Sequence, residues 1–168
     1  MKKWIAFWLI FALLLPLCAC DTQEEEPEIV SPIRFYYRRT EPVYADADSV
    51  ITFEVREAAG HESDYLYLMN LYLKGPQSPL FSRTFPKHVS VEQLEIRDSH
   101  AYIRVNDEFS YLAGLDMTFA CVCLTKTLCE MTGATKVTIT TPNSLLDGKQ
   151  SITMDLNSIL LVDFTSTP

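Results

Sequence analysis

Apolar and polar residues alternate along several short stretches of this chain, and a two-residue alternation predicts β-strands. In one stretch Ile51, Phe53 and Val55 fall on one side, with polar residues between them. Outside the hairpin described next, the stretches with strand character are residues 33–38, 50–57, 137–140 and 151–161.

The middle of the chain predicts a β-hairpin closed by a two-residue turn at Asp98 and Ser99. With that turn, both strands place their apolar residues on the same face, as cross-strand pairing requires. The predicted inner pairs are Ile96 with Ala101 and Leu94 with Ile103, and the outer pairs are Glu95 with Tyr102 and Gln93 with Arg104.

Two other stretches have the spacing of amphipathic helices. The first covers residues 64–74, with Ser63 or Asp64 as its N-cap and Gly75 just past its end. The second begins at Asp116 or Thr118 and ends at Gly133. The predicted apolar stripes are Leu66, Met69 and Leu73 in the first helix, and Met117, Cys121, Leu124, Leu128 and Met131 in the second.

From residue 50 the predicted order is strand-helix-strand-strand-helix-strand, which is a split βαβ pattern. We therefore expect an α+β fold in which two helices pack on one face of a small mixed or antiparallel sheet, with extra flanking strands. The length suits a single domain over residues 33–168.

The N-terminus predicts a secretion signal, because two lysines precede an apolar run that is short for a membrane span. The run ends in Leu17-Cys18-Ala19-Cys20, which resembles a bacterial lipobox with Cys20 as the lipidated residue. Cys18 is the poorer acceptor because bulky Leu17 precedes it. An ordinary cleaved signal with coincidental cysteines is the alternative. Lipidation would anchor the chain on the outer face of the bacterial cell membrane.

The predicted organisation is a signal peptide over residues 1–19, a lipidated cysteine and acidic tether over residues 20–32, and the domain. The tether is rich in glutamate and lacks aromatic residues, so it cannot bury enough surface to fold. The whole chain has a formal net charge of −8, and loss of residues 1–19 would remove two lysines and no acid. This acidic balance excludes nucleic acid as a partner.

The sequence contains no motif for catalysis, metal binding or a cofactor. The three histidines are far apart, no C-x-x-C occurs, and every glycine stands alone. We therefore expect a protein that is not an enzyme and holds neither a metal nor a cofactor. Cys121, Cys123 and Cys129 are interpreted as small buried apolar residues rather than a redox site.

Several short motifs, in a fixed order, resemble the GerMN domains of sporulation and spore-germination lipoproteins. The motifs are Leu71-Tyr72-Leu73-Lys74-Gly75-Pro76, Phe85-Pro86, Ala101-Tyr102-Ile103-Arg104-Val105-Asn106 with Phe109, and Lys126-Thr127-Leu128 followed by Gly133 and residues 137–139. The resemblance covers roughly residues 33–148. It implies a small α+β module, similar to ring-building motifs, that assembles with other proteins outside the cell membrane. It offers no catalytic residues.

Two hypotheses about function follow. The first is a membrane-anchored interaction module whose partner is another extracytoplasmic protein or an envelope complex. The second is a lipoprotein that binds a small ligand or a cell-wall fragment, with weak hydrolase activity as a variant. The candidate interaction surface consists of Tyr36, Tyr37, Arg38, Arg39, Phe109 and Tyr111. For the first strand, one buried and one exposed tyrosine is the alternative interpretation.

Overall fold

The computed structural model describes residues 32–41, 50–58 and 60–159, so the predicted signal peptide, Cys20 and residues 21–31 of the tether lie outside the described residues. The described elements are β1 (Pro32–Arg38), β2 (Ile51–Glu57), α2 (Tyr65–Leu73), β3 (Val91–Arg97), β4 (His100–Val105), the 3₁₀ helix η3 (Asp107–Tyr111), α3 (Gly114–Thr132), β5 (Lys136–Thr140), β6 (Ser151–Asp155) and the 3₁₀ helix η4 (Leu156–Ser158).

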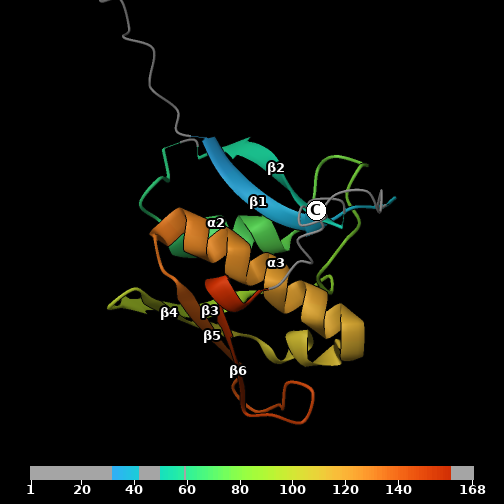
Figure 1. Cartoon of the computed structure of the whole chain (residues 1–168), viewed down its shortest axis with the longest axis vertical. Coiled ribbons are helices and arrows are strands. Elements are labelled where there is room, and N and C mark those ends of the chain that lie inside the picture. Colours follow the sequence, from blue (N-terminus) through green and yellow to red (C-terminus); the bar gives the residue numbers. More distant parts are fainter. Residues whose placement is uncertain (1–31, 42–49, 59, 160–168) are drawn as a thin grey trace, which may run out of the picture.

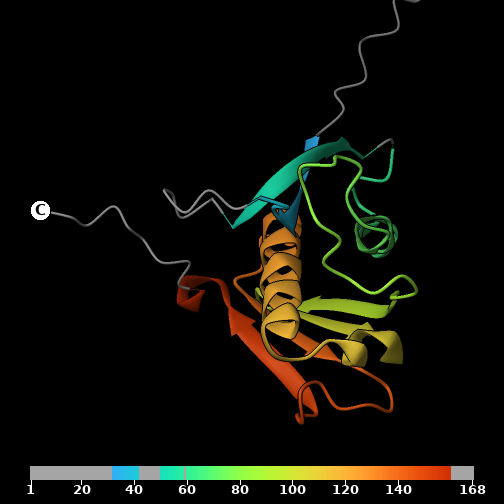
Figure 2. The same cartoon turned by 90° about the vertical axis from the view of Figure 1, so that its right-hand side faces the viewer.

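These elements form three layers with the two α-helices in the middle (Figure 1). The antiparallel ribbon β1–β2 lies on one side of the helices, and a four-stranded sheet of order β3-β4-β5-β6 lies on the other. The view turned by 90° shows α3 between the ribbon and the sheet (Figure 2). The predicted α+β class, with helices on one face of a mixed sheet, is confirmed.

The hairpin β3–β4 has the predicted register, with Ile96 opposite Ala101 and Leu94 opposite Ile103. Its turn residues Asp98 and Ser99 have φ angles of 47° and 63°. Two successive left-handed residues form the turn type whose twist matches the flanking strands. β5 then pairs parallel with β4, and β6 pairs antiparallel with β5, which makes the sheet mixed.

The capping residues predict the start of α2 and the end of α3, but α3 begins at Gly114, before the predicted Asp116 or Thr118, and no side chain among the described residues caps it. The Asp64 carboxylate accepts a hydrogen bond from the Tyr67 N–H at 2.9 Å, so Asp64 is the N-cap of α2. Gly133 closes α3 in the left-handed conformation, with φ of 73°. The predicted stripe of α2 is wrong in one residue, because Leu66 is exposed. The ribbon and the sheet bury α2 from two sides, and its buried residues are Leu68, Met69, Tyr72 and Leu73.

Two strands differ from the prediction. β2 does not join the main sheet as a split βαβ unit would require; it pairs with β1, because β3 and β5 already occupy the two edges of β4. The last strand ends at Asp155 rather than at residue 161. There the Asp155 carboxylate accepts a hydrogen bond from the Asn157 N–H at 2.9 Å and starts η4.

The three cysteines of α3 are buried and free. Burial raises the pKa of the Cys121 and Cys123 thiols to about 12, and that of Cys129 to about 11. The thiolate is the reactive form of cysteine, so these side chains serve as core residues. The structure thus confirms the interpretation made from their helical spacing.

Candidate interaction surface

The side chains of β1 divide between the core and the surface. Phe35 and Tyr37 point inward and are buried, and the Tyr37 hydroxyl donates a hydrogen bond to the Tyr72 carbonyl oxygen at 2.7 Å. Arg34 and Tyr36 lie on the opposite face of the strand, where Tyr36 is half-buried. The structure therefore supports the interpretation of one buried and one partly exposed tyrosine.

The outward face of β1 runs alongside α3. Glu130 accepts a hydrogen bond from the Tyr36 hydroxyl at 2.5 Å and pairs with Arg34 at 2.9 Å. Nearer the start of α3, Arg38 pairs with Asp116 at 3.2 Å. These contacts hold the ribbon against the helix along most of its length.

Aromatic and cationic side chains from β1, β2 and α3 meet on this outward surface. The guanidinium carbon of Arg34 lies 4.8 Å from the ring centroid of Phe53, and the Tyr36 and Phe53 centroids lie 5.7 Å apart. The Lys126 ammonium lies 4.9 Å from the Tyr36 ring centroid. We call this surface the aromatic–arginine face; its members are Arg34, Tyr36, Arg38, Phe53, Val55, Phe119, Lys126 and Glu130.

This face has the composition of a protein-binding surface. Val55 is 55 % exposed and Phe53 is 38 % exposed, and both are apolar. Aromatic residues and arginine carry much of the energy of protein–protein interfaces, and grouped exposed apolar residues are typical of such sites. Their side chains are already ordered by mutual contacts, so binding would cost less conformational entropy.

The structure corrects two members of the predicted surface. Tyr37 and Phe109 are fully buried, so neither can contact a partner. Phe109 stacks on Phe85 in the core, with ring centroids 6.3 Å apart. Tyr111 is 77 % exposed but lies before the N-terminal end of α3, whereas Tyr36 contacts its C-terminal half. Arg39 is half-buried and forms an isolated bridge with Phe81.

Sequence reasoning found only Tyr36 and Arg38 of this face and missed its other members, which are Arg34, Phe53, Val55, Phe119, Lys126 and Glu130. The alternation along residues 50–57 does place Phe53 and Val55 together. What was missing is that this side of the strand faces outward. That depends on the segment after α2 covering the other side, where Glu54 and Arg56 contact it, and no local pattern reports this.

An ion pair on the inner side of β2 fixes the ribbon. Glu54 and Arg56 pair at 2.5 Å, and their side chains are only 10 % and 7 % exposed. Arg56 donates to the Gly75 carbonyl at 2.7 Å, and Glu54 accepts from the Gln77 and Ser78 N–H groups at 3.0 Å each. This clamp ties the ribbon to the segment that follows α2.

The buried Glu54–Arg56 ion pair predicts that the fold is less stable in acid. Burial favours the protonated form of Glu54, but hydrogen bonds from the Ser78 N–H, the Arg56 guanidinium and the Gln77 N–H outweigh it and lower the pKa below 4.5. A carboxyl with a lowered folded-state pKa stabilises the fold above its unfolded pKa, and this contribution is lost as the pH falls through the folded value.

We therefore expect the free energy of unfolding to decline as the pH drops below about 4.5. Urea titrations between pH 7 and pH 3 measure it. The variant Glu54→Gln should be less stable at pH 7 and lose part of this pH dependence. An unchanged pH profile in that variant would show that Glu54 does not carry the effect.

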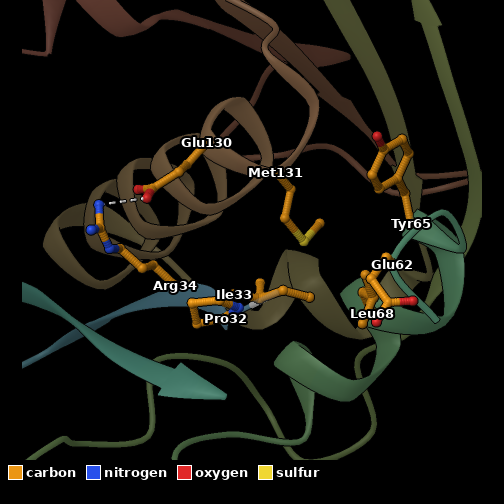
Figure 3. A pocket seen from close by; sticks show the side chains of 8 residues that line it. All are labelled: Pro32, Ile33, Arg34, Glu62, Tyr65, Leu68, Glu130 and Met131. Carbon is orange, nitrogen blue, oxygen red and sulfur yellow. Dashed lines mark hydrogen bonds and ion pairs between the residues drawn. The ribbon is translucent and has the colours of Figure 1, made fainter. Parts of the chain in front are cut away.

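A small pocket opens beside the Arg34–Glu130 pair, between the start of β1, α2 and the end of α3 (Figure 3). Its volume is about 250 Å³, and Ile33, Leu68 and Met131 supply apolar lining. Sites for small organic ligands usually enclose roughly 300–1,000 Å³ with several converging polar groups. The pocket is better described as a notch in the protein surface than as a ligand cavity.

The described residues show neither a candidate metal site nor a candidate membrane-spanning helix. Within residues 32–41, 50–58 and 60–159, no group of three or more metal-ligating side chains comes together. In the same ranges, no helix combines the length and apolar character that crossing a bilayer would need.

No known family profile matches the chain, and no curated protein matches its sequence. The fold nevertheless has counterparts among solved structures. The tandem GerMN domains of the sporulation protein GerM from Bacillus subtilis match with a TM-score of 0.53 and 16 % identity, over 76 % of this chain and 45 % of that chain. The first GerMN domain of the same protein matches with a TM-score of 0.50 and 18 % identity, over 71 % of this chain and 95 % of that domain.

The fold therefore defines a small three-layer α+β module, built from two helices, a ribbon and a mixed sheet. More particularly, it is a GerMN-like fold, as the resemblance in the sequence implies. The match extends over nearly all of one GerMN domain but less than half of the tandem pair.

Proposed function

We propose that this chain is a lipid-anchored, non-enzymatic interaction module outside the bacterial cell membrane, which binds another extracytoplasmic protein or envelope complex in sporulation or germination. The observation that carries the proposal is the aromatic–arginine face, where exposed apolar residues and ordered arginines share one surface. The GerMN-like fold supports it, because both solved counterparts belong to a sporulation protein.

An anchored domain also suits weak binding. A lipid on Cys20 and the acidic tether would confine the domain near the membrane, which raises its effective concentration for neighbouring proteins. Interfaces of modest affinity then suffice. A heterologous partner is favoured over a second copy, because loss of the two lysines in residues 1–19 would change the net charge from −8 to −10, and copies of this chain would repel at low salt.

Photo-crosslinking in native membranes tests the interaction. A crosslinking amino acid at position 55, the most exposed apolar position of the face, should capture a discrete partner. The variant Phe53→Ala should weaken this binding by about 2 kcal/mol, the usual effect of truncating an interface hot spot. Because Phe53 is partly exposed, the fold should remain intact in circular dichroism and thermal melts.

Tyr111→Ala is the matched control, since Tyr111 is an exposed aromatic residue outside the face. It should leave capture unchanged. Equal capture by wild type and Phe53→Ala would place the interface elsewhere. Loss of capture in Tyr111→Ala alone would move it to η3.

Lipid anchoring has its own prediction. The variant Cys20→Ala should accumulate as an unprocessed precursor or be released from the membrane, because the acyl chains that bury in the bilayer have no attachment point. Membrane fractionation, with mass spectrometry of the N-terminal peptide, measures both outcomes. A Cys20→Ala protein that is processed normally and retained in the membrane would contradict the lipid anchor.

A further inference from the structure

A second concave surface adjoins the aromatic–arginine face at the start of α3. It is a groove of about 290 Å³ between β1, the connector after α2 and the first turns of α3. Phe85, Pro86, Leu112 and Phe119 provide most of its apolar lining. We call it the connector groove. Its size suits one large side chain of a bound peptide rather than a separate small molecule.

Two guanidinium groups line this groove, from Arg38 and Arg83. The Arg38 Nε donates to the Ser82 hydroxyl at 3.3 Å, and its Nη1 pairs with Asp116 at 3.2 Å. Arg83 is held by the carbonyl oxygens of Phe85 and Lys74, at 3.2 Å from Nε and 2.9 Å from Nη2. Each side chain is thus oriented by the protein.

Both guanidiniums keep unused hydrogen-bonding capacity. The five N–H donors of arginine form a rigid fork that matches a carboxylate. Within the described residues, the contacts of Arg83 use Nε and Nη2, both to neutral carbonyl oxygens, and the ion pairs found there do not include this residue. As far as the described residues go, its Nη1 group therefore remains to bind an anion, and no carboxylate among them neutralises its positive charge.

Building on the proposed function, we propose that the connector groove binds an acidic, apolar segment of the partner protein. A carboxylate of that segment pairs with Arg83 and Arg38, and the neighbouring apolar side chain packs on Phe119 and Leu112. Charge complementarity favours this occupant. Asp116 also lines the groove and pairs with Arg38, so the charge of Arg83 leaves the groove lining with a net positive charge. The rest of this acidic chain repels acidic peptides, so this positive charge would fix where such a segment can dock.

The competing explanation is structural. In that explanation Arg83 serves only to satisfy the Lys74 carbonyl at the end of α2, which is a normal task for a basic side chain at a helix C-terminus. That explanation predicts no affinity for acidic peptides. The two accounts therefore differ in a binding measurement, and not merely in stability.

The test uses the mature chain, labelled with ¹⁵N, and a blocked hexapeptide of alternating glutamate and leucine as the probe. We expect saturable shifts of the Leu112 and Phe119 amides and weakening by salt. The matched peptide with glutamine in place of glutamate should bind at least about tenfold more weakly, because the pairing with guanidinium is lost. Equal binding of both peptides would overturn the proposal.

Arg83→Gln should lower the affinity for the glutamate peptide about tenfold. Arg97→Gln, which changes an exposed arginine on the hairpin, should leave this affinity unchanged. Arg83→Lys keeps the charge and should restore part of the affinity. If Arg83→Gln unfolds, Phe119→Ala gives an independent test at the half-buried apolar wall. Unchanged affinity in a folded groove variant, or shifts confined to other surfaces, would refute the site.

A different occupant is also detectable. If replacing Glu24, Glu25, Glu26 and Glu28 with glutamine raises the affinity for the probe peptide, the chain's own tether competes for the groove. The assignment of the groove to a partner protein would then be wrong. Failure of the two proposals can be told apart. If the peptide does not bind but position 55 still crosslinks a partner, only the proposal for the connector groove is refuted. If the peptide binds but position 55 crosslinks no partner, the proposal for the aromatic–arginine face is refuted.

Discussion

Replacing Arg56 with alanine is expected to lower the free energy of unfolding by about 3–5 kcal/mol, which is typical of removing one partner of a buried ion pair. The variant leaves the Glu54 carboxylate without its counter-ion and the Gly75 carbonyl without its donor. It also removes a guanidinium whose central carbon lies 5.2 Å from the Phe35 ring centroid. Urea denaturation at pH 7 measures the loss.

Arg97→Ala is the matched control for this variant. Arg97 pairs with Glu95 at 2.6 Å on the hairpin, but the two side chains are 66 % and 43 % exposed. Exposed ion pairs contribute about 0–1 kcal/mol because water screens them. Similar losses in the two variants would mean that burial of the Arg56 pair does not set its contribution.

Replacing Tyr72 with alanine should destabilise the fold by about 3–5 kcal/mol, the usual cost of truncating a buried aromatic side chain. Tyr72 joins three elements: its ring packs against those of Tyr37 at 4.9 Å and Phe85 at 5.0 Å between centroids, and its hydroxyl donates to the Tyr36 carbonyl at 2.6 Å. Denaturant titration and thermal melts would report the change.

The variant Tyr72→Phe distinguishes the contribution of the ring to stability from that of the hydroxyl. It keeps the packing but leaves the Tyr36 carbonyl without this donor, so we expect a loss of about 1–3 kcal/mol. A loss below about 1 kcal/mol in Tyr72→Ala would contradict the central position of this residue between α2 and the ribbon. Equal losses in both variants would mean that the hydroxyl, and not the ring, holds the ribbon.

These two residues also account for the placement of the candidate surface. Tyr72 and Arg56 anchor the inner side of the ribbon, and this turns Phe53 and Val55 outward toward solvent. A variant that loosens either anchor should therefore disturb binding indirectly. For this reason the function tests use Phe53→Ala, which leaves both anchors in place.

Local signals in the sequence determined the hairpin turn, the start of α2 and the end of α3. The register of the hairpin followed from the alternation and from Asp98-Ser99, and the helix ends followed from Asp64 and Gly133. Each of these features depends on the backbone preferences and hydrogen bonds of neighbouring residues, so the sequence reports it directly. The motif order also indicated the GerMN-like fold.

The tertiary structure alone decided which faces are buried and which strands pair. Arg56 is buried because Gly75, Glu54 and Tyr37 supply partners, and Phe109 is buried because Phe85 lies beside it. β2 forms a ribbon with β1 because the edges of β4 are occupied. Such outcomes depend on contacts between residues far apart in the chain, and no window of sequence contains both partners.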